Sequence, residues 1–214
     1  MASPAEFLGL TPRHVPQGGD GLPRPLRVQV EEGVYHLVSR GVRRLPIYSD
    51  DTSRRKFLSL LDLVTSKYRW ELHTYCLMTN HYHLLVTTVD PTLSAGMQYL
   101  LSCYAQWFDW RHGFEGHVFE RRFYSREITT DRDLMSTARY ILLNPVRAGI
   151  CDTAADWRWS SYHATAGTTT GGPALSNWDL DYFRRRKPDQ ARERFVDFIR
   201  AGEADARSRR TERG

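Results

Sequence analysis

Two strand-like runs joined by only two residues limit most strongly how this chain can fold. The runs extend from Trp70 to Met78 and from His81 to Thr88, and Thr79 and Asn80 alone separate them. A link of two residues suits a tight hairpin between antiparallel strands. The sequence therefore predicts an antiparallel sheet that contains this hairpin.

The segments around the hairpin complete the fold prediction. Gly33 to Arg40 alternates as a half-buried strand does, with Val34, His36 and Val38 on one face. A further short strand is expected at FYSREIT (123–129), and three helices are expected at 51–67, 93–112 and 131–143. The order strand, helix, strand, strand, helix, strand, helix predicts a ferredoxin-like α/β sandwich of the α+β class. We expect helices to cover one face of the sheet and leave the other free for a ligand.

The chain of 214 residues is long enough for one domain with extensions at both ends. We expect a flexible leader at 1–27, where five of the ten prolines lie, a folded domain at 28–167, and a linker with a basic tail at 168–214. Within that tail, Asp189 to Arg200 has the spacing of a short amphipathic helix.

The charge and hydropathy patterns point to a cytoplasmic protein with a polyanionic partner. The formal net charge is +5, and all of the excess lies from Arg184 onward. A basic tail favours contact with a polyanion, although a solvated tail has the same composition. No apolar run approaches the length of about 18 residues that a membrane span needs, and the N-terminus lacks the pattern of a secretory signal.

The sharpest local motif is MTNHYHLLV, in which one residue separates His81 from His83. Because side chains alternate along a strand, both imidazoles point to the same face and could hold one divalent cation. Two histidines with this spacing also occur on polar or packed surfaces, so the motif alone does not decide between the two readings.

A second feature is Tyr140 near the end of the last predicted helix, with Asn144 four residues later. Helical spacing would place both side chains on one face. Alone, Tyr140 is typical of a core aromatic residue, and Asn144, which precedes Pro145, is typical of a helix C-cap.

The combination of these residues suggests phosphodiester chemistry. Cleavage by a tyrosine needs a phenol as nucleophile, a cation to neutralise the phosphate, and basic groups that hold the strand. Tyr140 offers the first, and His81 and His83 the second. The candidate basic groups for DNA binding are Arg43, Arg44, Arg121, Arg122, Arg126, Arg139 and Arg147. Aromatic residues interleaved with them could stack on unpaired bases, namely Tyr35, Tyr82, Phe119, Phe123 and Tyr124.

At this point the chain resembles the REP-associated tyrosine transposases, which belong to the single-tyrosine branch of the HUH endonucleases. The resemblance runs from about Gly33 to about Gly167 and rests on YHLVSRGVRR, HTYCLMTNHYHLLV, GHVFERRFYS, ARYILLNPVRAGI and DWRWSSYHATAG, in family order. The segment after Gly171 falls outside it.

The resemblance implies a function and a role for each motif residue. It implies a Mg²⁺ or Mn²⁺ ion on His81 and His83, Tyr140 as the nucleophile toward single-stranded DNA, and Asn144 completing the metal shell. Tyr82 fills the middle position of the motif, where a hydrophobic residue is usual. Family members cut at short palindromic hairpin repeats, so the implied substrate is a hairpin with a single-stranded flank.

Two other functions remain compatible with the residues. A ferredoxin-like sheet with aromatic residues also describes non-catalytic nucleic-acid-binding modules, and a metal-dependent hydrolase could use water in place of Tyr140. The sequence leaves open the target repeat, the identity of the metal, and whether the protein is a monomer or a homodimer.

Overall fold

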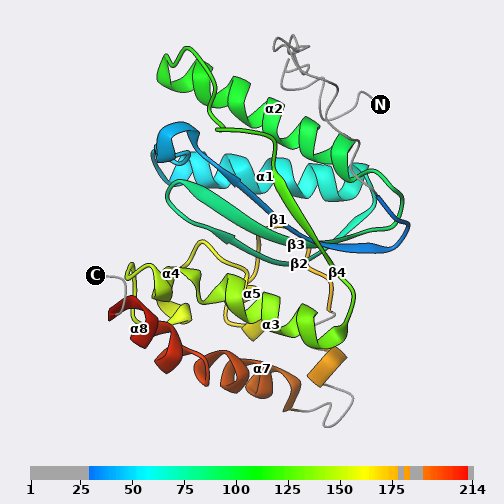
Figure 1. The fold of residues 1–214 in the computed structure, drawn as a ribbon, viewed down its shortest axis with the longest axis vertical. Helices are drawn as coiled ribbons and strands as arrows, with labels where there is room; N and C mark the ends of the chain where they lie inside the picture. The colour runs from blue at the N-terminus through cyan, green and yellow to red at the C-terminus, as the bar shows by residue number, and fades with distance from the viewer. Residues whose placement is uncertain (1–28, 178–180, 184–189, 212–214) are drawn as a thin grey trace.

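The computed structural model describes residues 29–177, 181–183 and 190–211. Its sheet has four antiparallel strands in the order β2-β3-β1-β4 (Figure 1). The strands are β1 (Gly33–Arg40), β2 (Trp70–Leu77), β3 (His81–Thr88) and β4 (Tyr124–Ile128). The helices of the domain are α1 (Asp51–Lys67), α2 (Leu93–His112), α3 (Asp131–Leu142), α4 (Asn144–Arg147) and α5 (Tyr162–Ala166). Two helices near the C-terminus are α7 (Ala191–Arg200) and α8 (Glu203–Thr211).

This arrangement confirms the predicted ferredoxin-like sandwich, and local sequence signals explain where its helices begin. Asp50 caps α1 by accepting a hydrogen bond of 2.7 Å from the Ser53 backbone nitrogen. Thr130 caps α3 in the same way, at 3.2 Å from the Asp133 nitrogen. Such caps satisfy amides that have no partner within the helix.

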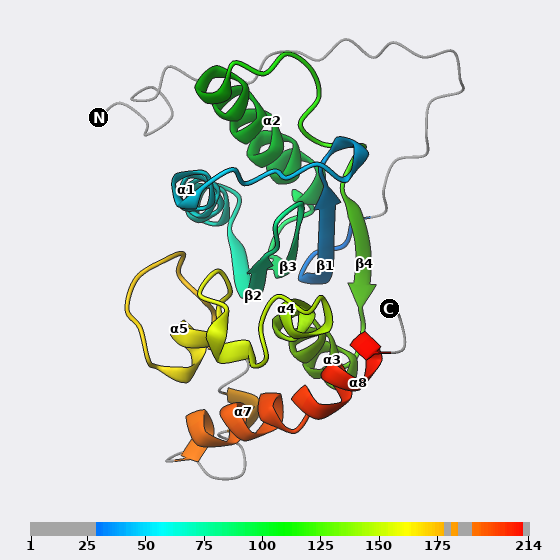
Figure 2. The same ribbon diagram turned by 90° about the vertical axis from the view of Figure 1, so that its left-hand side faces the viewer.

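Helices cover both faces of the sheet, which differs from the prediction that one face stays free. Figure 2 shows α1 and α2 on one side of the sheet and α3 on the other. The apolar residues of α3 recur at Leu134, Ala138 and Ile141 and pack against Cys76 and Leu85 of the sheet. The amphipathic pattern of α3 therefore buries part of the face that was expected to be open.

The C-terminal region is more ordered than a flexible tail. The predicted helix at 189–200 begins at Ala191, and Phe195 and Ile199 on it are 1% and 0% exposed. They pack with Leu142 and Leu143 at the end of α3, so α7 belongs to the same packed body as the sheet. The leader at 1–27 lies outside the described residues, and the division at 28–167 and 168–214 stays a prediction.

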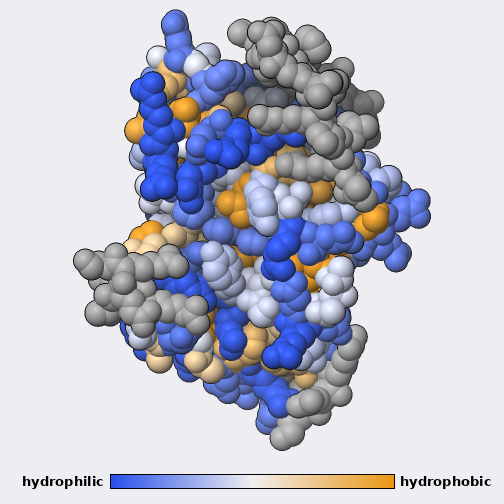
Figure 3. All heavy atoms as spheres, viewed as in Figure 1, coloured by the Kyte–Doolittle hydropathy of each residue, from blue (hydrophilic) through white to orange (hydrophobic). Residues whose placement is uncertain are grey.

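Among the described residues, no helix combines the length and the apolar character that crossing a bilayer would require. On the face drawn in Figure 3, hydrophilic side chains cover most of the surface over β4 and α3.

Candidate active site

His81 and His83 point to the same face of the sheet, as the strand alternation predicts. Their ring centroids lie 5.1 Å apart, and the rings meet edge to face. Tyr82 between them points to the opposite face, where it is fully buried and its ring lies 4.8 Å from that of Phe57 on α1. The middle residue of the motif therefore anchors β3 in the core, while its neighbours reach the face covered by α3.

A third histidine, His36 on β1, joins this pair. Its Nε2 lies 2.9 Å from Nδ1 of His83, and the two rings stack with centroids 5.2 Å apart. Sequence reasoning placed His36 on a strand face but gave it no role. The alternation of β1 shows which face His36 lies on, but not which residue of β3 lies beside it. The register decides this, because it pairs Val38 with His83 and so brings His36 diagonally next to His83.

Tyr140 reaches the histidines from the last turn of α3. Its ring centroid lies 5.8 Å from that of His83 and 6.2 Å from that of His36, and the side chain is 42% exposed. Its backbone carbonyl accepts hydrogen bonds from Asn144 Nδ2 at 3.1 Å and from Arg147 Nη1 at 2.9 Å. These bonds hold the end of the helix that carries the phenol.

The C-cap of α3 is Leu143 and not Asn144 as the sequence allowed, but the side chain of Asn144 bonds the end of the helix and also lines the candidate site. Its amide nitrogen bonds the carbonyls of Tyr140 and Ile141, which satisfies groups at the helix end. The amide oxygen is then the atom that Asn144 could offer to a cation. A role at the helix end and a role in the candidate site are both compatible with this position.

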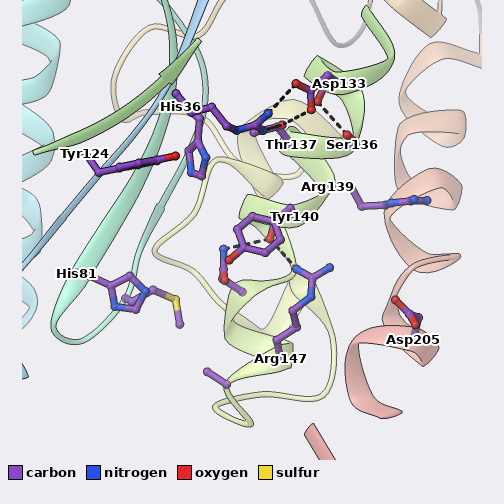
Figure 4. A pocket seen from close by; sticks show the side chains of 14 residues that line it. His36, His81, Tyr124, Asp133, Ser136, Thr137, Arg139, Tyr140, Arg147 and Asp205 are labelled. Carbon is purple, nitrogen blue, oxygen red and sulfur yellow. Dashed lines mark hydrogen bonds and ion pairs between the residues drawn. The ribbon is translucent and has the colours of Figure 1, made fainter. Parts of the chain in front are cut away.

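His36, His81, Tyr140 and Asn144 line one pocket of about 720 Å³, and His83 lies buried behind them, in contact with His36. Figure 4 shows Tyr140 between His36 and Arg147, with His81 across the pocket. The lining residues are His36, Met78, His81, Tyr124, Arg126, Asp133, Ser136, Thr137, Arg139, Tyr140, Asn144, Arg147, Ala148 and Asp205. The structure thus brings a phenol, imidazoles, an amide and arginines to one cavity.

Burial keeps the imidazoles of the site neutral. It lowers the pKa of His81 to about 4, with Arg40 adding to the effect. Burial and then Arg126 lower the pKa of His36 to about 4, against an opposing effect of Asp133. For His83, burial comes first and the neighbouring histidines second, and together they hold its pKa well below the usual range. A neutral imidazole can donate a lone pair to a metal without first losing a proton.

The donor set fits a hard divalent cation only if the amide takes part. Within 29–177, 181–183 and 190–211, no three His, Cys, Asp or Glu side chains cluster as a metal site would require. Two imidazoles with centroids 5.1 Å apart can share an ion at metal–ligand distances of about 2.1 Å. With Asn144 as a third ligand, water or phosphate oxygens would complete the shell, as is usual for Mg²⁺.

The predicted DNA-binding arginines divide into two groups. Arg126, Arg139 and Arg147 line the pocket, and each has a protein contact there. Arg126 pairs with Asp133 at 2.7 Å. The guanidinium of Arg139 stacks 4.5 Å from the ring centroid of Phe198 on α7, and that of Arg147 lies 4.7 Å from the ring centroid of Tyr140.

The second group lies on two neighbouring loops. Arg43 and Arg44 form a short turn after β1, and Arg121 and Arg122 precede β4; all four are exposed. The loops are joined by backbone hydrogen bonds, such as that from the Val42 nitrogen to the Val118 oxygen at 3.0 Å. These four guanidinium groups form an exposed basic surface, which we call the loop arginines.

The predicted stacking role is wrong for most of the interleaved aromatic residues. Tyr35, Tyr82 and Phe123 are 3%, 0% and 6% exposed and belong to the core under α1 and α2. Phe119 is partly buried against the same core, whereas Tyr124 is 58% exposed and lines the pocket. Tyr124 is therefore the member of that set whose ring a base could reach.

Comparisons with known proteins identify the family and the fold. A family model described as "Transposase IS200 like" matches residues 29–144. A Haemophilus influenzae protein assigned as a REP-associated tyrosine transposase is 28% identical over 119 residues, which is 50% of this chain and 68% of that protein. A solved structure of a REP-associated tyrosine transposase bound to a REP hairpin has a TM-score of 0.58 at 18% identity. The match covers 72% of this chain and 99% of that one, and it shows that the two proteins share a fold.

Proposed function

The chain belongs to the IS200-like transposase family, and on this premise we propose that it cleaves and rejoins single-stranded DNA through a covalent bond to Tyr140. The observation that carries the proposal is the position of Tyr140, which lines a pocket together with three arginines and whose ring lies 5.8 Å from that of the buried His83. A phenol beside imidazoles and guanidinium groups matches the needs of phosphoryl transfer.

The substrate we propose is a DNA hairpin with a single-stranded flank. The relative from Haemophilus influenzae is assigned to the REP-associated group, and the structural neighbour was solved with a REP hairpin. The loop arginines offer an exposed surface for the phosphates of such a hairpin, and Tyr124 offers a ring for an unpaired base. A protein that acts on such repeats would work in the cytoplasm, at the nucleoid.

In the first step, the phenolic oxygen of Tyr140 attacks the scissile phosphorus. The bond from phosphorus to the 3′ oxygen breaks, and that oxygen takes up a proton and leaves as a free 3′-hydroxyl. The phenolic proton passes to solvent, and the Arg147 guanidinium over the ring stabilises the phenolate that forms. The product is a 5′-phosphotyrosine.

In the second step, a 3′-hydroxyl attacks the phosphotyrosine and releases Tyr140. The ester to tyrosine retains the energy of the phosphodiester bond, so joining needs no nucleotide cofactor. Asn144 and Arg147 hold the carbonyl of Tyr140 and so keep the phenol in place between the two steps.

A divalent cation, Mg²⁺ or Mn²⁺, held by His81, His83 and Asn144 would supply the positive charge that polarises the scissile phosphate. Burial keeps both imidazoles neutral near pH 7, so neither must lose a proton before it binds a cation. The members of the family are in general metal-dependent, which supports this assignment.

The experiment that tests the proposal follows a covalent adduct. Purified protein is incubated with hairpin oligonucleotides taken from repeats that flank its own gene, with Mn²⁺ or with EDTA, and run on a denaturing gel. A 3′ label reports the fragment bound to protein, because the phosphotyrosine retains the strand downstream of the cut; a 5′ label reports the fragment with the free 3′-hydroxyl.

The expected result is a metal-dependent adduct that the wild type forms and Tyr140→Phe does not, with hairpin affinity unchanged within a few-fold. Cutting without an adduct would replace the proposal with hydrolysis by water. Binding without cutting would leave a DNA-binding protein on a transposase fold, and an adduct with Tyr140→Phe would show that another residue is the nucleophile.

A further inference from the structure

Asn80 determines which nitrogen of His81 carries the proton. The amide nitrogen of Asn80 donates to the backbone oxygen of Arg44 at 2.8 Å, and a carbonyl can only accept. The amide oxygen must therefore face Nδ1 of His81, from which it is 2.8 Å away. An amide oxygen cannot donate, so His81 holds its proton on Nδ1 and leaves the lone pair on Nε2.

The pair formed by His36 and His83 allows two arrangements, because each neutral imidazole has one donor and one acceptor nitrogen. Either His83 donates from Nδ1 to Nε2 of His36, or His36 donates in the opposite direction. Only the first arrangement leaves Nε2 of His83 unprotonated. The second would place a proton on the nitrogen that points away from His36 and would exclude that atom as a ligand.

We propose that His36 and Asn80 are positioning residues that hold His83 and His81 in the same tautomer, with the proton on Nδ1 and Nε2 available to a divalent cation. The inference rests on the proposed function, because that function places the cation on this pair. A histidine that binds a metal through one ring nitrogen usually donates a hydrogen bond from its other ring N–H to an acceptor nearby. That acceptor fixes both the tautomer and the ring orientation.

The two partners act from different parts of the fold. His36 lies on β1, next to β3 in the sheet, and the register of the strands brings its ring into a stack with His83 at an interplanar angle of 22°. Asn80 belongs to the tight turn between β2 and β3 and also bonds the turn that carries Arg44. The same amide thus joins the loop arginines to one candidate metal ligand.

The test reads the tautomers directly by long-range ¹H–¹⁵N correlation NMR of the full chain, without metal, at pH 7.5. The protein has 8 histidines, and the signals of His81 and His83 are assigned by replacing each in turn. In the wild type, both rings are expected to carry the proton on Nδ1. A proton on Nε2 of His83 would overturn the proposal. Because this measurement uses the wild-type tautomers, it does not depend on whether a variant of His36 or Asn80 folds.

Matched variants then distinguish the effect of removing the hydrogen-bond acceptor from the effect of changing the volume of the side chain. His36→Phe retains the ring volume without an acceptor, and His83 is expected to change tautomer; His36→Gln retains an oxygen acceptor and should preserve it. Asn80→Ala should release His81, and Asn80→Asp should hold it. Tautomers that stay unchanged in His36→Phe and Asn80→Ala would show that these partners do not set them.

Mn²⁺ affinity, measured by electron paramagnetic resonance, completes the test. We expect His36→Phe to weaken binding by about 10-fold to 100-fold, as is usual for such partners, and His36→Gln to stay within a few-fold of the wild type. Equal affinities for wild type and His36→Phe would contradict the proposal. Correct tautomers and Mn²⁺ binding without a DNA adduct would instead contradict the proposed function and leave this inference standing.

Discussion

The two faces of the sheet are built from the same strands, but the face covered by α3 combines an apolar cluster with a polar pocket. On the face covered by α1 and α2, residues such as Leu37, Tyr82 and Leu84 are fully buried in one apolar cluster. On the face covered by α3, His36 and His83 are buried beside a polar pocket. Burial of polar imidazoles costs free energy. The difference shows that the first face supplies the stability with which the second holds its polar groups in place.

The largest expected effect comes from the residue between the two motif histidines. Tyr82→Ala should lower the free energy of unfolding by about 3 to 5 kcal/mol, because it removes a fully buried ring from the cluster around Phe57. Urea denaturation followed by circular dichroism measures the change. Tyr82→Phe, which retains the ring, should stay within about 1 kcal/mol of the wild type. A small effect of Tyr82→Ala would contradict the assignment of stability to this face.

Replacement of the adjacent residue, His81, should reduce cleavage strongly and change stability little. His81→Ala is expected to reduce Mn²⁺-dependent cleavage by on the order of 100-fold or more, about 2.7 kcal/mol of transition-state stabilisation. Stability should change by less than about 1 kcal/mol, because His81 is only partly buried. Single-turnover cleavage and urea denaturation are measured on the same samples. If His81→Ala unfolds the protein, its role is structural and the contrast between the faces fails.

Buried histidines should make the fold sensitive to acid, and His73 tests this outside the pocket. It is 2% exposed, bonds Thr87 Oγ1 at 2.7 Å, and burial lowers its pKa to about 4. Because its pKa in the folded state lies below the unfolded value of about 6.5, the stability it contributes is present above that value and is lost as the pH falls toward 4.

At pH 5.5, His73 alone should account for a loss on the order of 1 kcal/mol relative to pH 7.5. His73→Gln, which does not titrate, should therefore show a smaller loss of unfolding free energy between these two pH values than the wild type does. If urea denaturation gives the same loss between the two pH values for the wild type and for His73→Gln, His73 contributes nothing to the acid sensitivity.

The fold was predictable where the sequence carries local signals. Asp50 and Thr130 mark helix starts, Thr79 and Asn80 mark the hairpin, and Pro145 marks the end of α3, so the predicted element bounds agree closely with the structure. The shared face of His81 and His83 follows from alternation within one strand, which needs no knowledge of the rest of the fold.

The remainder depended on contacts between distant segments. His36 meets His83 only through the strand register, and Arg139 meets Phe198 only because α7 packs on α3. Most of the aromatic residues predicted to stack on bases proved to pack in the core, because the sequence shows which residues share a face but not which face the helices cover. The same limit explains why α3 was not expected over the histidines.

The smallest expected effect tests where the polar face ends. Arg44 is exposed, and its carbonyl is bound by Asn80 beside His81, so we infer that its guanidinium group extends the binding surface beyond the pocket. Arg44→Ala should weaken hairpin binding a few-fold and reduce the slope of log affinity against log salt by about 1, as the loss of one phosphate contact does. Arg55→Ala removes the same charge from an exposed position on α1, which covers the sheet face opposite to α3 and the pocket, and should change neither quantity. Equal effects of the two variants in fluorescence anisotropy titrations would assign the change to net charge, and the binding surface would then stop at the pocket.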